Sequence, residues 1–349
     1  MTITVNAVIE TGNTTDETAS ALLTTLREAT SRPELDFAAP PTVLRGGFYA
    51  EMRRFKLADP PPGLEGALVA RIVPDPTLGE WEALVQGYVA AQGFATPSVR
   101  LVVSSDSPLG RYLIVMDAID GDPPMAGLGI TTVAKQIPNL LRRLPDQLAS
   151  VAAALHALDP EPLAEQIKQL NSPIPATTLG FIEHQANNAA ALGQSGLAAA
   201  GRRLLETEPA STARVISHGD LHPFNLLIAD GNPVLIDWTV ARIAHPAFTI
   251  AFTDLMLENP PIPLPRAGTY ALGPVIRSIS RRFLSRYRTL ATPAGQITEE
   301  TLAWHRKVHA LRILVEVAGW DAAGSRPTHG HPWLILEPVA RNELGLPTP

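Results

Sequence analysis

The 349-residue chain contains no cysteine. This absence excludes disulfide bonds, zinc sites built on thiolates and catalysis by a thiol nucleophile. Aromatic residues are scarce at 5%, and charged residues make up only 18%, which is less charge than disordered segments carry. No apolar run is long enough to suggest a membrane span, so we expect no membrane association. The composition predicts a globular chain with a substantial core.

Positive charge is also in short supply. The formal net charge is −6, and a nucleic-acid partner would require a basic face, so we expect none. The first twenty residues lack a positively charged stretch followed by an apolar one, which argues against a secretion signal. We therefore expect a cytoplasmic location.

Two different sequence patterns occupy two parts of the chain. The first third alternates short apolar runs with turn residues, and the remainder has mostly helical apolar spacing. We expect a helix over 16–30, strands within 42–72, 99–103 and 111–116, a helix over 79–92, and later helices over 140–158, 190–205, 274–290 and 301–317. A hairpin over 226–236, around the turn 229–232, interrupts the helical part. The pattern predicts an α+β fold with a small antiparallel-sheet lobe and a larger helical lobe.

One segment concentrates the residues that chemistry needs. It reads His218-Gly219-Asp220-Leu221-His222-Pro223-Phe224-Asn225, and Asp237 follows the hairpin. Phosphoryl transfer calls for a carboxylate near the acceptor hydroxyl, and for an amide oxygen and a second carboxylate to bind Mg²⁺. Because the hairpin folds back beside the loop, we expect Asp220, Asn225 and Asp237 to converge.

This segment resembles the aminoglycoside phosphotransferase and choline kinase-like family, whose loop reads H-G-D-x-x-x-x-N and is followed by I-D-[WF]. The resemblance implies a two-lobed protein kinase-like fold that moves the γ-phosphoryl group of ATP or GTP to a hydroxyl of a small molecule. It implies Asp220 as catalytic base and Asn225 and Asp237 as Mg²⁺ ligands. His218 would be structural, and His222 would lie near the phosphates or the acceptor.

The resemblance also implies a nucleotide site and a division of the chain. The division places a helical segment at 1–38, a nucleotide-binding lobe at 39–119 and a lobe for catalysis and acceptor binding at 120–349. The nucleotide-binding candidates are the turn Gly46 and Gly47, the cation Arg71, its acid Glu82, and the hinge residues Met116, Asp117 and Ile119. Glu80 is a second candidate for the acid that holds Arg71. Taken singly, the glycine turn, the arginine and the hinge are also typical of a plain turn, a solvated charge and a buried strand.

Three alternatives stay open at this point. Asp220 and Asn225 could merely tie a turn through side-chain hydrogen bonds. His218 and His222 could bind a metal in a hydrolase, although ligands four residues apart need a helix and Gly219 and Pro223 oppose one. The third alternative is a kinase-like protein that binds a nucleotide or ligand without turnover.

The chain departs from the family pattern after Asp237. The family continues through G-D-P-A-x-D, and here His245 and Thr249 stand in place of the two acids. In the family these acids are thought to brace the catalytic loop. Asp254 is a candidate to compensate for them.

The acceptor is predicted only by class, as a small hydroxylated molecule: an aminoglycoside, a macrolide, a sugar or another alcohol. Polycations demand an acidic cleft, and the C-terminal helices carry more basic than acidic residues, which argues against aminoglycosides. We expect a monomer or homodimer. Some residues could form an aromatic acceptor wall, although such residues more often pack in the core or on the surface; they are Trp304, Trp320, His329, His331 and Trp333.

Overall fold

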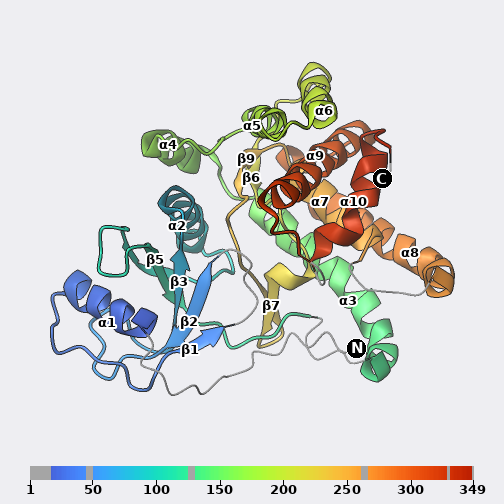
Figure 1. Cartoon of the computed structure of the whole chain (residues 1–349). Helices are drawn as coiled ribbons and strands as arrows, with labels where there is room; N and C mark the ends of the chain where they lie inside the picture. Colours follow the sequence, from blue (N-terminus) through green and yellow to red (C-terminus); the bar gives the residue numbers. More distant parts are fainter. Residues whose placement is uncertain (1–16, 45–49, 125–129, 261–265, 328–330, 348–349) are drawn as a thin grey trace. The chain divides into compact units, whose positions relative to one another are not determined.

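The structure is a computed structural model that describes residues 17–44, 50–124, 130–260, 266–327 and 331–347. Of 130–141 and 266–272, only the backbone is described. The chain divides into two compact units (Figure 1). The first unit comprises residues up to Val133 together with Gln166–Ile174 and Leu226–Thr239, and the second comprises Ala134–Glu165, Pro175–Asn225 and Val240 onward.

A five-stranded antiparallel sheet in the order β1-β2-β3-β5-β4 forms the centre of the first unit (Figure 1). Its elements are α1 Glu17–Thr30, β1 Thr42–Leu44, β2 Glu51–Phe55, β3 Leu68–Val73, α2 Pro76–Ala91, β4 Val99–Val103 and β5 Tyr112–Asp117. Asp75 caps α2 by accepting the N–H of Thr77, and Pro76 begins the helix, as helix starts prefer.

The side chains of the central strand β3 point alternately to the two faces of the sheet and pack in two separate cores. Leu68, Ala70 and Ile72 pack with the cluster that includes Leu22 and Leu26 of α1. Val69 and Val73 belong to a second cluster that contains Ala83 of α2. Successive strand residues point to opposite faces, so Arg71 shares the α2 face with Val69 and Val73.

A hairpin of β7 Leu226–Ala229 and β8 Asn232–Leu235 also belongs to the first unit. The Leu235 N–H donates to the Ala95 carbonyl, and the Thr96 hydroxyl donates to the Leu235 carbonyl. At the other strand, the Ile228 N–H donates to the Asp122 carbonyl. These bonds fix the strand end that carries Asp237.

The second unit is mainly helical. Its core gathers apolar side chains of α5, α6, α7, α9 and α10, and α7 is buried on all sides from Ala247 to Leu257. Helices α3 and α4 cross the division between the units. The remaining elements are α3 Ile130–His156, α4 Glu161–Leu170, α5 Thr178–Ala191, α6 Ser195–Glu206, β6 Val215–Ser217, β9 Arg242–Ala244, α7 Ala247–Glu258, α8 Arg266–Leu290, α9 Glu299–Ala323 and α10 Pro332–Glu343.

The prediction of an α+β fold is confirmed, but one predicted helix was wrong. The helix expected over 190–205 is two helices, α5 and α6, because the chain turns at Gly193 with a φ of 73°. The short pair β6–β9 and the helices α4, α7 and α10 were not predicted. Within the described ranges, none of the helices combines the length and apolar character that crossing a membrane requires.

Candidate active site

A loop in the second unit runs from the end of β6 to Asn225 and carries Asp220. Gly219 within it has a φ of 71°, and a Cβ there would lie 2.4 Å from Cε1 of Phe248. Both the left-handed backbone and the close approach therefore require glycine at this position. Gly219 thus packs closely against Phe248, and Asp220 is the next residue of the loop.

Hydrogen bonds that all run in one direction hold the start of the loop. The Gly219 N–H donates to Oγ1 of Thr249 over 3.2 Å, and the Thr249 hydroxyl donates to Oγ of Ser217 over 3.1 Å. Ser217 in turn donates to the carbonyl of His245. Thr249 therefore braces the loop at one of the positions where the family pattern has an acid. Asp254 does not compensate, because its carboxylate binds Ser280 and Arg306.

The two histidines of the loop both bind backbone groups through Nδ1. His218, fully buried, accepts from the Asp220 N–H, and His222 accepts from the Phe224 N–H. The segment between them is not helical, and the first helical turn begins only at Pro223. The arrangement of ligands four residues apart on a helix, which the hydrolase alternative needs, is therefore not formed.

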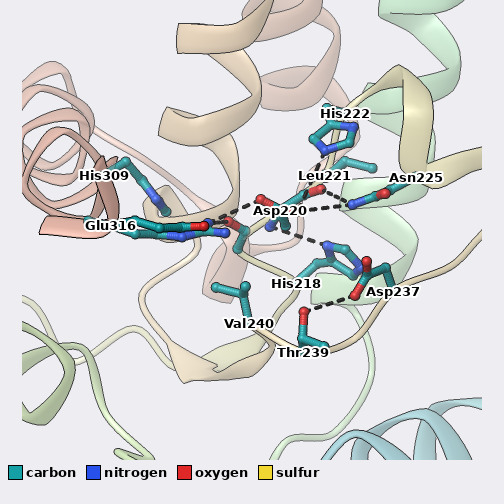
Figure 2. A network of polar contacts seen from close by, with 12 residues as sticks. His218, Asp220, Leu221, His222, Asn225, Asp237, Thr239, Val240, His309 and Glu316 are labelled. Carbon is teal, nitrogen blue, oxygen red and sulfur yellow. Dashed lines mark hydrogen bonds and ion pairs between the residues drawn. The ribbon is translucent and has the colours of Figure 1, made fainter. Parts of the chain in front are cut away.

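Asn225 is oriented by Asp220. Its Nδ2 donates to Oδ2 and to the carbonyl of Asp220, each over 3.0 Å (Figure 2). His222 Nε2 lies 3.5 Å from the same Oδ2. Since the amide nitrogen faces the carboxylate, the oxygen Oδ1 of Asn225 is the atom left to bind a cation.

Arg312 of α9 binds the other oxygen of Asp220. Its Nη1 lies 3.1 Å from Oδ1 of Asp220 and 3.3 Å from the Gly219 carbonyl. The guanidinium carbon lies 5.4 Å from the ring centroid of Phe252 and 5.3 Å from that of Trp333. Aromatic faces attract a guanidinium at such distances, so Arg312 is held on the carboxylate from two sides. Sequence reasoning missed this residue, whose only signal was its place among the basic residues of a C-terminal helix.

The surroundings of Asp220 keep it ionised. Its burial disfavours the charged form, but the charge of Arg312 and the hydrogen bond from His222 outweigh burial, so the pKa of Asp220 lies well below its usual range. The side chain is 14% exposed. Asp220 is thus a fixed carboxylate acceptor at any physiological pH.

A second group of predicted residues comes together in the first unit. Arg71 Nε lies 2.9 Å from Oε1 of Glu82, and Arg71 Nη2 lies 3.4 Å from Oδ1 of Asp237. Glu82 is 1% exposed, whereas the alternative acid Glu80 is exposed. Strand alternation and the α2 packing explain why Arg71 and Glu82 meet.

Charges in this group influence each other. Burial raises the pKa of Glu82 to about 7, and the carboxylate of Asp237 acts in the same direction while Arg71 opposes it. Burial disfavours the charged form of Arg71, but Glu82 and Asp237 outweigh it and raise its pKa. A buried guanidinium between two acids stays charged.

Asp237 adopts an uncommon backbone conformation. Its φ is 68°, which is rare outside glycine and is typical of functional sites. The Thr239 hydroxyl donates to Oδ1 of Asp237 over 2.8 Å (Figure 2). The adjacent Trp238 is buried, and its Nε1 donates to Oγ1 of Thr96. These contacts orient a carboxylate that is 35% exposed and accessible to an ion.

The predicted hinge lies at the end of β5. Met116 is buried and its sulfur accepts from Nε2 of Gln86. The Asp117 N–H donates to the Ser98 carbonyl, and its carboxylate binds Arg100. Ile119 follows the strand and is partly buried. Gly46 and Gly47 lie outside the described residues.

Donor chemistry at the predicted metal ligands suits Mg²⁺. The amide oxygen of Asn225 and the carboxylate oxygens of Asp237 are, each taken by itself, hard oxygen ligands of the kind that this ion prefers. Across the part of the chain that the structure describes, no group of three or more His, Asp or Glu side chains is arranged as a metal site. A nucleotide's phosphate oxygens and water would have to complete the coordination of a bound ion.

A family model described as a phosphotransferase enzyme family matches residues 44–270 of the chain. This range contains the loop 218–225, Asp237 and the Arg71–Glu82 pair. No curated protein sequence matches the chain.

Solved structures of similar fold come from several kinases of small molecules. Aminoglycoside-3'-phosphotransferase of type VIII is 20% identical, with 84% of this chain and 99% of that one covered and a TM-score of 0.55. A choline/ethanolamine kinase family protein from Mesorhizobium loti is 15% identical, with 94% of each chain covered and a TM-score of 0.51. A thermostable mutant of aminoglycoside phosphotransferase APH(4)-Ia, in a ternary complex with AMP-PNP and hygromycin B, is 16% identical, with 93% and 97% covered and a TM-score of 0.56. The predicted kinase-like fold is confirmed.

Proposed function

Because the chain belongs to the phosphotransferase enzyme family, we propose that it transfers the γ-phosphoryl group of ATP or GTP to a hydroxyl of a small molecule. The observation that carries this proposal is the fixed, ionised carboxylate of Asp220, held by Arg312 on one oxygen and Asn225 on the other.

Asp220 is proposed to orient the acceptor hydroxyl and to take its proton. With so low a pKa, this carboxylate cannot deprotonate a free alcohol. As the bond from the acceptor oxygen to the γ-phosphorus forms, however, the hydroxyl becomes strongly acidic, and its proton passes to Asp220 late in the step. Positioning is thus the main contribution of Asp220.

Asn225 and Asp237 are proposed to hold Mg²⁺. When bound, this ion neutralises charge on the triphosphate. Arg71 is proposed to contact phosphate oxygens, and Glu82 to hold its guanidinium in place, because a forked cation suits phosphate geometry. The hinge at Met116, Asp117 and Ile119 is proposed to receive the base of the nucleotide. The AMP-PNP complex of APH(4)-Ia supports a nucleoside triphosphate as the phosphoryl donor.

A second candidate is a kinase-like protein that binds nucleotide without turnover. The contact between Arg312 and Asp220 favours it, since an arginine on the catalytic carboxylate competes with an acceptor hydroxyl. The two candidates differ in one respect only, which is whether a phosphate ester forms.

Triphosphate consumption over a panel of hydroxylated compounds, with Mg²⁺ present, tests the proposal. We expect acceptor-dependent formation of the nucleoside diphosphate, its loss when Mg²⁺ is chelated, and its loss in Asp220→Ala. Nucleotide binding that depends on Mg²⁺ and on Asp237, with no product from any acceptor, would favour the second candidate.

A further inference from the structure

A pocket of about 520 Å³ opens in the second unit between α5 and α9. Arg312 connects it to the catalytic loop, because the same side chain lines the pocket and binds Asp220. Pockets of this volume bind small molecules of drug-like size. The lining residues are Gln185, Asn188, Ala191, Leu192, Arg312, Val315, Glu316, Gly319 and Trp320.

Gly319 is one of the residues that line the pocket. It lies inside α9, one of the long helices, and a Cβ built on it would meet no atom within 4 Å. Glycine is among the poorest helix formers, and here neither a positive φ nor close packing requires it. The absent side chain leaves open space beside the helix backbone, which a bound molecule can occupy.

Trp320 stands next to this space as a supported flat surface. Its ring makes an edge contact with His331, with centroids 4.5 Å apart at 75°. Burial lowers the pKa of His331 to about 4, so the imidazole that supports the indole ring is uncharged at pH 7. Trp304 and Trp333, by contrast, are buried in the helical core. Of the aromatic wall predicted from sequence, Trp320 is the tryptophan that lines the pocket.

The charges that line the pocket are already engaged. Arg312 is paired with Asp220, and Oε2 of Glu316 accepts the Nε1–H of Trp333 over 2.8 Å. The other polar groups are the neutral amides of Gln185 and Asn188. Because Arg312 is already paired with Asp220, Glu316 is the one acid of this lining that no cation among the lining residues balances, and a single carboxylate is too little charge to select a polycation.

We propose that this pocket is the acceptor subsite and that it binds a neutral, polyhydroxylated ring, such as a sugar or the sugar part of a glycoside. The apolar C–H face of the ring lies on Trp320 above Gly319, and the amides and Glu316 bind its hydroxyls. This inference rests on the proposed phosphotransferase function.

Arg312 leads one ring hydroxyl to Asp220 for the chemical step. The acceptor oxygen forms a bond to the γ-phosphorus, and the bond from that phosphorus to the bridging oxygen of the nucleoside diphosphate breaks. The hydroxyl proton goes to Asp220 and from there to solvent. The products are the phosphate monoester of the sugar and the nucleoside diphosphate.

The variant Gly319→Leu fills the space without threatening the helix, because leucine favours helices more than glycine does. Gly87→Ala is the matched control, since Gly87 is also a helical glycine with nothing within 4 Å, on α2 of the other unit. The probes are neutral methyl glycosides and 2-amino-2-deoxy sugars of the same ring size, each with Mg²⁺ and ATP. Binding is followed by tryptophan fluorescence with AMP-PNP in place of ATP.

Transfer to neutral glycosides is expected to exceed transfer to the charged amino sugars. Gly319→Leu should raise the KM for the glycoside by roughly tenfold or more, with the KM for ATP and the melting temperature retained. Gly87→Ala should change neither KM. A preference for amino sugars, or an unchanged glycoside KM in Gly319→Leu, would overturn the inference, as would no binding and no transfer with any glycoside.

The failures of the two proposals can be told apart. If another alcohol is phosphorylated equally well by the wild type and by Gly319→Leu, the enzyme is a phosphotransferase and the assigned pocket is wrong. If glycosides bind, and Gly319→Leu abolishes that binding, but no phosphate ester forms with any acceptor, the pocket stands as a ligand site and the phosphotransferase proposal fails.

Discussion

Nη1 of Arg312 lies 3.1 Å from Oδ1 of Asp220, although 92 residues separate the two in the chain. Both side chains are nearly buried, at 12% and 14% exposure. The pair keeps Asp220 ionised in an environment whose burial alone would favour its neutral form. Arg312 therefore sets the protonation state of the proposed base, and its removal provides the first prediction.

Arg312→Met retains an unbranched stem between Phe252 and Trp333 but removes the charge. Burial then dominates, so the pKa of Asp220 rises. In the wild type, protonation of Asp220 should cause no decrease of kcat/KM at or above pH 5, because the carboxylate stays ionised there. In the variant, kcat/KM should decrease at the acidic end of that range, and it should recover as pH increases. Identical pH profiles would contradict the electrostatic role, and Arg312→Lys should restore part of the wild-type profile.

Thr249→Val removes the hydroxyl that accepts from Gly219 and donates to Ser217, while nearly preserving the volume of the side chain. The buried Gly219 N–H loses its partner, so we expect a loss of about 1–3 kcal/mol in the free energy of unfolding. We also expect kcat to fall, because the start of the loop loosens. Chemical denaturation and steady-state kinetics measure the two effects. Thr249→Ser keeps the hydroxyl and should stay close to wild type; equal losses in both variants would point to packing instead.

Among the described residues, Glu82→Ala leaves the buried guanidinium of Arg71 with Asp237, at 3.4 Å, as its one charged partner. Breaking a buried pair in this way costs about 3–5 kcal/mol of folding stability. The double variant Arg71→Met/Glu82→Leu removes both charges and should recover most of the stability. It should not recover affinity for the nucleotide, since the proposed phosphate contact is gone. Nucleotide affinity at the wild-type level in the double variant would contradict the role of Arg71.

Buried histidines should make the second unit sensitive to acid. Burial lowers the pKa of His156, His305 and His309 to about 3 each. Their unfolded pKa is about 6.5, so the unfolded state takes up protons first as the pH falls. Stability should be fully present above pH 6.5 and decline from there toward the folded pKa values, by at most about 1.4 kcal/mol per pH unit for each histidine. Urea denaturation at several pH values measures this slope.

His156→Phe tests one of these histidines. The Tyr287 hydroxyl donates to the Gly295 carbonyl, so His156 must donate to it through Nδ1–H, and its Nε2 is left buried without a partner. The variant should flatten the pH dependence by one proton between pH 4 and 6.5. Tyr287→Phe, which keeps His156, should lower stability at every pH and leave the slope unchanged. A slope unaffected by His156→Phe would show that this histidine does not couple to folding.

Sequence pattern alone predicted the parts of the site that depend on local geometry. The spacing of Asp220 and Asn225 places both on one loop. Arg71 and Glu82 were named only through the family resemblance, and the alternation along β3 explains in the structure why the two side chains meet. The break between α5 and α6 escaped prediction because apolar spacing continued across Gly193. Contacts over long sequence separation, such as those of Arg312 and Thr249 with the loop that carries Asp220, leave no local pattern. The segment boundaries 1–38, 39–119 and 120–349 stay a prediction.

The most direct test of the central claim is phosphorus NMR of ATP, Mg²⁺ and a panel of hydroxylated acceptors with the wild type and with Asp220→Asn. The asparagine keeps the shape of the side chain but cannot accept a proton. We expect a phosphate monoester signal with the wild type and a rate at least about 100-fold lower with Asp220→Asn. Equal rates of ester formation in the two proteins, or no ester from the wild type with any acceptor, would contradict it.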